Sequence, residues 1–306
     1  MTAKDWLFVA LGLVAVVYLA VFILGVRAAS RKRAVAHGVN PDGGVAPSPL
    51  MLAIGFVTNF FDTLGIGSFA TTTAAYKLKR VIPVRLIPGT LNVGHTIPTI
   101  AQAFIYTKIV PVDSFTLIAM IAASCLGSWL GAGVVARWPR RTVQMAMGLA
   151  LLGAAALLAV KVLNILPSGG QTLDLTGARL AAGLVGNFFL GMLMMIGIGL
   201  YAPCMILIAL LGMNPAAAFP IMMGSCAFLM PTSSVRFVRS EAFHVRAALG
   251  LAIGGLPAVL IAAYLVKSLP LAAVYWLVIV VVVYTAVNML MTARHEDEPA
   301  AATPHA

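Results

Sequence analysis

Gly65-Ile66-Gly67 recurs 132 positions later as Gly197-Ile198-Gly199. Further matches are Pro83 with Pro215, Pro88 with Pro220, and Asn59-Phe60-Phe61 with Asn187-Phe188-Phe189. Residues 50–160 and 181–291 therefore read as two copies of one unit. Duplicated units whose apolar segments are interrupted by Gly and Pro at corresponding places are typical of secondary transporters.

The composition is that of an integral membrane protein. The chain is 61% hydrophobic and 9% charged, with a mean hydropathy of +1.01, whereas soluble domains average about 25% charged residues. Apolar runs of roughly 20 residues recur along the chain, and each is long enough to cross about 30 Å of hydrocarbon. The runs are continuously apolar rather than alternating, which favours helices over a β-barrel.

The net charge of +11 does not indicate a nucleic-acid partner. The basic residues lie in short loops beside apolar segments, where they act as topology signals. Cys125, Cys204 and Cys226 all lie within apolar stretches. Their odd number and spacing predict neither a disulfide framework nor a metal site, and nothing in the sequence indicates a cofactor.

Two apolar stretches, 49–79 and 180–213, are too long to be ordinary spans. The ordinary spans are expected at 5–27, 86–106, 114–136, 142–163, 217–235, 247–266 and 271–292. A straight helix of about 30 residues would run roughly 45 Å, beyond the hydrocarbon thickness. Each overlong stretch is interrupted near its middle by Gly-Ile-Gly. They are therefore either re-entrant hairpins or broken spanning helices.

Charge asymmetry favours the hairpins, because basic clusters flank the first stretch on both sides and prefer the cytoplasm. In the hairpin topology, all but five of the 20 Lys and Arg residues are cytoplasmic. The five exceptions are Lys4, Lys108, Lys161, Arg179 and Lys267. This topology places the N-terminus outside and the C-terminus in the cytoplasm. Each repeat then has one hairpin and three spans, and the odd number of spans makes the repeats inverted.

The predicted fold is therefore all-α and membrane-integral, with two inverted repeats and one extra N-terminal transmembrane helix. The expected organisation is an N-terminal helix with a cytoplasmic linker (1–48), repeat one (49–163), a linker (164–179), repeat two (180–292) and a cytoplasmic tail (293–306). The sequence leaves the oligomeric state open, a homodimer included.

The hairpin tips are the candidate substrate site. A helix that begins inside the membrane has unpaired backbone N–H groups and a positive dipole end, which suit a small anion. The candidate binding residues are Gly65, Gly67, Ser68, Thr71, Gly197, Gly199 and Tyr201. Alternatively, the glycines serve only close helix packing. No Lys or Arg occurs from Gly38 to Tyr76, so an anion here would be bound without an Arg clamp.

Polar residues near the tips have two interpretations each. Asp62 is a candidate carrier of a coupling proton or a carboxylate that caps the turn. His95 is a candidate anion donor or proton relay, or a hydrogen-bonded packing residue. Asn59 and Asn187 either line the site or tie hairpin to bundle. Asn92 and Ser225 complete the set of candidate lining or supporting residues.

Three stretches resemble the sulfite exporter TauE/SafE family. They are Gly-Ile-Gly-Leu-Tyr-Ala-Pro at 197–203, Asn-Pro-Ala-Ala-Ala at 214–218, and Leu-Ile-Pro-Gly-Thr-Leu-Asn-Val-Gly-His at 86–95. The resemblance covers roughly residues 50–291. It implies a bacterial inner-membrane permease for sulfite, organosulfonates or related sulfur-containing anions. Family tips usually have a downstream proline, as at Pro203, whereas repeat one has Thr71 in that place.

The sequence thus predicts a secondary transporter for a small sulfur-containing anion, working by alternating access with proton coupling. Its expected partners are this anion and the lipid bilayer. A carrier for carboxylates or another small anion, and an anion channel, remain alternatives. No Gly-x-Ser-x-Gly or His-Glu-x-x-His motif is present, so an enzyme is not expected.

Overall fold

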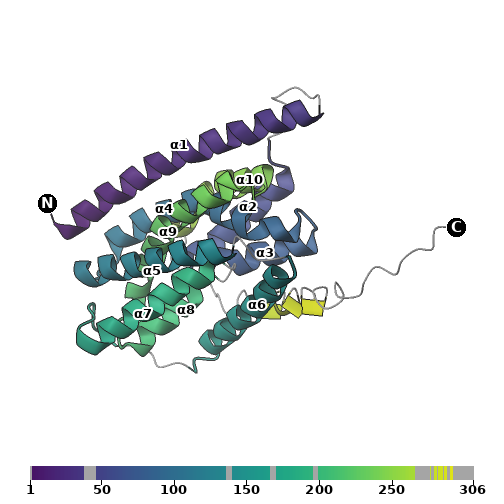
Figure 1. The fold of residues 1–306 in the computed structure, drawn as a ribbon. Coiled ribbons are helices and arrows are strands. Elements are labelled where there is room, and N and C mark those ends of the chain that lie inside the picture. The colour runs from purple at the N-terminus through teal and green to yellow at the C-terminus, as the bar shows by residue number, and fades with distance from the viewer. Residues whose placement is uncertain are drawn as a thin grey trace.

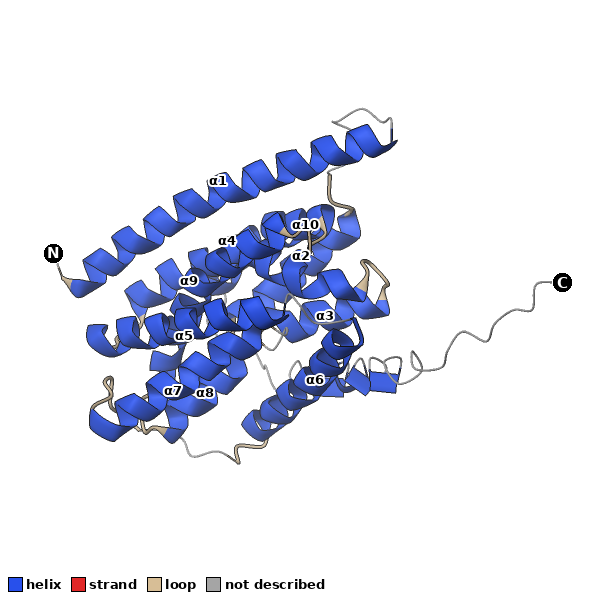
Figure 2. Ribbon diagram, viewed as in Figure 1, coloured by secondary structure: helices blue, strands red, loops and turns tan. Residues whose placement is uncertain are grey.

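The computed structural model describes residues 2–37, 46–135, 140–165, 170–195 and 199–265, together with short helical pieces between 276 and 291. Within these residues the chain is helical, apart from turns and one isolated bridge between Thr172 and Met213 (Figure 2). The helices are α1 (Ala3–His37), α2 (Pro49–Thr63), α3 (Ser68–Leu78), α4 (Ile87–Ile109), α5 (Ser114–Val135), α6 (Arg140–Val162), α7 (Gly177–Met194), α8 (Tyr201–Leu210), α9 (Ala218–Arg239) and α10 (Val245–Leu265). Two 3-10 turns, η2 (Val84–Leu86) and η3 (Pro215–Ala217), precede α4 and α9.

The first overlong stretch is broken where the sequence predicts. α2 begins at Pro49, with the Ser48 hydroxyl accepting a hydrogen bond from the N–H of Met51. The break follows Leu64, and Gly65 and Gly67 have φ angles of +87° and +92°. Residues other than glycine rarely adopt this region. The two glycines therefore turn the chain within a few residues, and α3 begins directly after them.

The second overlong stretch is also broken in its middle. α7 ends at Met194 and α8 begins at Tyr201. Pro203 lies in the first turn of α8, a position where its missing N–H removes no helical hydrogen bond. Gly197 lies outside the described residues.

Helices of the two repeats pack in exchanged pairs. α2 packs against α10 and α7 against α5, while α4 and α9 pack against each other at the centre. α4 also contacts α10, just as α9 contacts α5. The ribbon shows α1 along the outside of this bundle (Figure 1). The longer helix of each broken stretch, α2 or α7, thus packs mainly against a helix of the opposite repeat.

Glycines make the hairpin contacts close. A side chain at Gly254 on α10 would collide with the Leu52 carbonyl of α2. A side chain at Gly191 on α7 would likewise collide with the Ser124 carbonyl of α5. Backbones approach this closely in membranes because small residues at the interface permit it.

Five described helices are long and apolar enough to cross a membrane: α1, α5, α7, α9 and α10. α9 is the most enclosed, with 78% of its most apolar window buried, whereas α1 has 22%. Large apolar side chains on α1, such as Trp6 and Leu13, are exposed. The protein is a multi-pass membrane protein. α1 is longer than the predicted span, because its helix continues through the basic residues to His37.

We expect Gly254→Ala to destabilise the protein by about 1–3 kcal/mol, because the added methyl group pushes α10 away from α2. Thermal unfolding of the detergent-solubilised protein measures this loss. Gly153→Ala on α6 is the matched control, since a Cβ atom added there would have no neighbour within 4 Å. Equal melting temperatures for the two variants would contradict the packing argument.

Candidate functional site

The two helix breaks meet inside the bundle. A Cβ atom built on Gly67 would lie 3.9 Å from the Cβ of Tyr201, and one built on Gly199 would lie 3.6 Å from the Cβ of Phe69. Gly67 and Gly199 are equivalent in the repeat, as are Phe69 and Tyr201. Each break therefore contacts the other through the same pair of positions. We call residues 64–69 the first tip and residues 199–201 the second tip.

A small cavity lies between the tips. Its lining residues are Asp62, Gly67, Ser68, Phe69, Thr99, Met194, Gly199, Leu200, Tyr201, Cys226 and Met230. The cavity offers about 10 Å³ to the centre of a water molecule, which is room for about one water. An anion with several heavy atoms does not fit without movement. The described conformation therefore has no room for such an anion.

Asp62 is the acidic group of this cavity, and its side chain is 1% exposed. Nε2 of Gln102 donates hydrogen bonds of 2.9 Å to Oδ2 of Asp62 and 2.9 Å to Oγ1 of Thr63. The Tyr201 hydroxyl donates to Oε1 of Gln102 at 2.6 Å. The backbone N–H and the hydroxyl of Ser68 also face the carboxylate. Asp62 thus lies at the N-terminus of α3, where a helix favours negative charge.

The helices α2, α3, α4 and α8 place no Lys or Arg close to this carboxylate. α2 and α8 contain no Lys or Arg, and on α3 and α4 these residues lie near the C-terminal ends, at Lys77 and Lys108. A buried charge without a partner is costly. The compensation here comes from the Gln102 amide and the α3 N-terminus.

His95 lies behind the first tip rather than in the cavity lining. Its Nδ1 is 3.0 Å from Oδ1 of Asn59, and its Nε2 is 3.0 Å from Oγ1 of Thr72. Nδ2 of Asn59 donates to the Gly55 carbonyl, so Oδ1 is the acceptor in the contact with His95. This network assigns the proton to Nδ1 and makes Thr72 the donor to Nε2. His95 therefore ties α2 to α3.

The other predicted residues lie around the tips without lining the cavity. The Thr71 hydroxyl donates to the Gly67 and Ser68 carbonyls of its own helix. Nδ2 of Asn92 donates to the Pro88 carbonyl, and its Oδ1 accepts from Ser233. Gly65 faces the ring of Phe219.

Asn187 joins α7 to two other helices. Its Nδ2 donates to the Met120 carbonyl at 2.7 Å and to the Ser225 hydroxyl at 3.0 Å. Its Oδ1 is buried and makes no hydrogen bond within the described part of the chain. Asn187 and Asn59 thus both connect hairpin helices to the bundle.

Two polar residues of α4 belong to the site although the sequence reasoning did not select them. Gln102 connects both tips, and Thr99 lines the cavity. Together with His95 they lie at positions i, i+4 and i+7, which share one face of a helix. That spacing of polar residues along one face of a membrane helix is the signal by which they could have been found.

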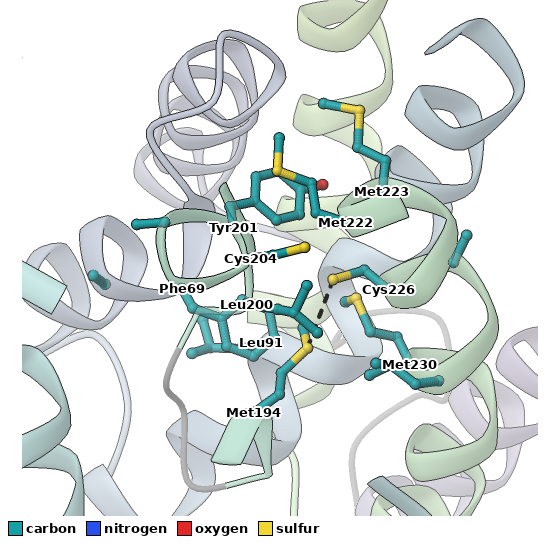
Figure 3. Packing of buried hydrophobic residues seen from close by; sticks show 14 of the residues in the cluster. Phe69, Leu91, Met194, Leu200, Tyr201, Cys204, Met222, Met223, Cys226 and Met230 are labelled. Atoms are coloured by element: carbon teal, nitrogen blue, oxygen red, sulfur yellow. Dashed lines mark hydrogen bonds between the residues drawn. The ribbon is translucent and has the colours of Figure 1, made fainter. Parts of the chain in front are cut away.

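Sulfur-containing side chains form the opposite wall of the cavity. Sγ of Cys226 lies 3.7 Å from Sδ of Met194, and Met230 is beside them (Figure 3). Within the described residues, no three His, Cys, Asp or Glu side chains gather as metal ligands would. The cavity therefore has one polar wall from the first repeat and one soft, apolar wall from α7 and α9.

Residues 179–306 match the family model described as sulfite exporter TauE/SafE. The match confirms the resemblance, and it includes the second tip, α8 and α9. The description of this family model is that of a membrane exporter of sulfite. No curated protein matches the chain.

We expect Gly67→Ala to lower stability by about 1–3 kcal/mol, because alanine is strained at a φ of +92°. Gly199→Ala is the matched change in the second tip, where the new methyl group meets nothing closer than 3.6 Å. It should unfold at the parental temperature. Thermal unfolding in detergent compares the two, and a Gly199→Ala loss as large as that of Gly67→Ala would contradict this assignment.

Proposed function

We propose that this protein is a secondary transporter that moves sulfite, an organosulfonate or a related small sulfur-containing anion by alternating access, coupled to protons. The observation that supports the proposal best is the meeting of two helix breaks at one buried cavity with a single carboxylate. Broken helices contacting each other near the centre of a duplicated bundle are where secondary transporters bind substrate.

The anion is bound by backbone and hydroxyl donors. The first N–H groups of α3 and α8 have no helical acceptors, and both helices begin at the cavity. Ser68, Thr99 and Tyr201 add hydroxyl groups to the lining. These are the donors that suit the oxygens of a sulfite or sulfonate group, and the apolar wall of Met194 and Met230 suits its sulfur and any short tail.

Asp62 couples the anion to a proton. Its carboxylate faces the Ser68 N–H, so the ionised form competes with an incoming anion for the α3 N-terminus. Protonation removes this competing negative charge and leaves the N-terminus available. Proton and anion therefore bind together and cross the membrane in the same direction.

The repeats are inverted, and the hairpins are re-entrant. Support comes from the exchanged packing of α2 with α10 and of α7 with α5, and from the reciprocal contacts of the tips. These reciprocal contacts are the ones that a twofold axis between the tips would relate. When it lies in the membrane plane, exchanging the conformations of the repeats exposes the cavity to the opposite side. The N-terminus is then outside and the C-terminus cytoplasmic, in a bacterial inner membrane.

Flux of labelled sulfite and of one organosulfonate into proteoliposomes, with and without an imposed pH gradient, tests this function. We expect saturable flux that rises with the proton gradient. In Asp62→Asn the gradient-driven accumulation should disappear, because the amide binds no proton. Exchange of internal for external anion should persist, because the neutral amide leaves the α3 N-terminus free.

Asp174→Asn is the control, because it makes the same chemical change on an exposed residue of the linker. Gradient-insensitive flux in the parent protein would remove the proton role of Asp62 and keep the carrier. Absence of flux for both anions would refute the substrate class.

Competition separates the sulfur-anion carrier from its alternatives. We expect an excess of unlabelled ethanesulfonate over labelled sulfite to suppress sulfite flux several-fold. Acetate at the same concentration as ethanesulfonate should leave the flux unchanged, because the apolar wall favours the larger, softer sulfonate headgroup. Equal suppression by both would favour a general carrier of small anions. Flux that rises linearly with concentration would favour a channel.

A further inference from the structure

The polar contacts that fix the first tip are missing at the matched positions of the second repeat. Thr72 and His95 correspond, at the 132-residue offset, to Cys204 and Ala227. The first pair is hydrogen-bonded at 3.0 Å, whereas an alanine side chain forms no hydrogen bond. The link between α3 and α4 therefore has no equivalent between α8 and α9.

Additional bonds from α4 reinforce the first tip. The Tyr106 hydroxyl donates to the Thr63 carbonyl at 2.7 Å, and Gln102 donates to both Asp62 and the Thr63 hydroxyl. These bonds join the end of α2 to one face of α4. The first hairpin and α4 therefore form one rigid unit.

α8 has one residue that can make a comparable side-chain hydrogen bond. Its sequence, Tyr-Ala-Pro-Cys-Met-Ile-Leu-Ile-Ala-Leu, contains a single side chain with a hydroxyl, amide or charged group, which is Tyr201. The Tyr201 hydroxyl donates to Oε1 of Gln102 at 2.6 Å. The amide of Gln102 is itself oriented by Asp62 and Thr63, so it offers Tyr201 a fixed acceptor.

The other end of α8 is anchored. The Asn214 N–H donates to the Thr172 carbonyl at 2.8 Å, and the Gly170 N–H donates to the Met213 carbonyl at 3.0 Å. The Thr172 hydroxyl donates to the carbonyl of Gly212, whose φ is +80°. α8 is thus held at its C-terminal end by these hydrogen bonds, has an apolar body about 15 Å long, and has one hydroxyl-bearing side chain, Tyr201, at its tip.

We propose that α8 is the element that moves when the cavity opens, and that the hydrogen bond from Tyr201 to Gln102 is the latch that holds it closed. This inference rests on the proposed transport function, because it assigns the moving part of that transporter. Tyr201 and Gln102 act as positioning residues: they set the population of the open state. The first hairpin remains fixed on α4, and Gln102 of α4 is the acceptor that Tyr201 binds in the closed state.

Cys226 is a built-in reporter of opening. Its side chain is 1% exposed and lines the cavity beneath the second tip. The rate at which N-ethylmaleimide alkylates Cys226, followed by peptide mass spectrometry on the otherwise native protein, measures how often the cavity opens. Tyr201→Phe keeps the ring and removes the donor, so we expect labelling about five-fold faster.

Tyr76→Phe is the matched control in the first hairpin, where it removes the hydrogen bond from Tyr76 to the Ala247 carbonyl. Cys226 labelling should stay at the parental rate in this variant. An unchanged rate in Tyr201→Phe, or an equal rise in Tyr76→Phe, would overturn the proposal.

Gln102→Met provides a second, independent test because it removes the acceptor. The double variant with Tyr201→Phe should label no faster than Gln102→Met alone, since both changes break the same bond. Multiplied effects in the double variant would show that the two residues act separately and would overturn the latch. Labelling requires no substrate, so its outcome is independent of whether sulfur anions are transported.

Discussion

Backbone groups at a helix break inside hydrocarbon have no water to satisfy them, and the architecture depends on this constraint. Two breaks, one in each repeat, are placed against each other rather than against lipid. The central helices α4 and α9 enclose them, and glycines let each hairpin approach the opposite repeat closely. A cavity between two helix N-termini is the result. In the proposed function, the same groups that would be unsatisfied in lipid are the donors for the anion.

The two repeats share this frame but differ in chemistry. The first repeat supplies Asp62, Ser68 and Thr99 to the cavity lining, whereas the second supplies Tyr201 and the sulfur-containing side chains of Met194, Cys226 and Met230. The hydrogen-bonded pair Thr72 and His95 of the first tip has Cys204 and Ala227 as counterparts in the second repeat. Duplication explains the shape of the site. Divergence between the copies explains why the carboxylate and the hydrogen-bonded tip both belong to the first repeat.

The helix breaks could be predicted from sequence because they follow from local properties. An apolar stretch too long for the membrane, interrupted by glycines, has few other conformations, and Gly65 and Gly67 have the positive φ angles that only glycine adopts readily. The lining of the cavity could not be predicted in the same way. Whether His95 faces the cavity or the back of α3 depends on the rotation of α4 against α2, and that rotation is set by packing between distant segments. The role of Gln102 as a link between the two tips can be recognised only when the positions of both tips in the fold are known.

The small size of the cavity links binding to movement. Its room for about one water means that an anion enters only when the tips separate. Separation ends the contact between Gly67 and Tyr201 and exposes the first N–H groups of both helices. In the proposed transport cycle, an anion that bridges those groups would replace the contact that was lost, and protonation of Asp62 would remove the competing charge. The proposal therefore couples anion, proton and opening through the same few atoms.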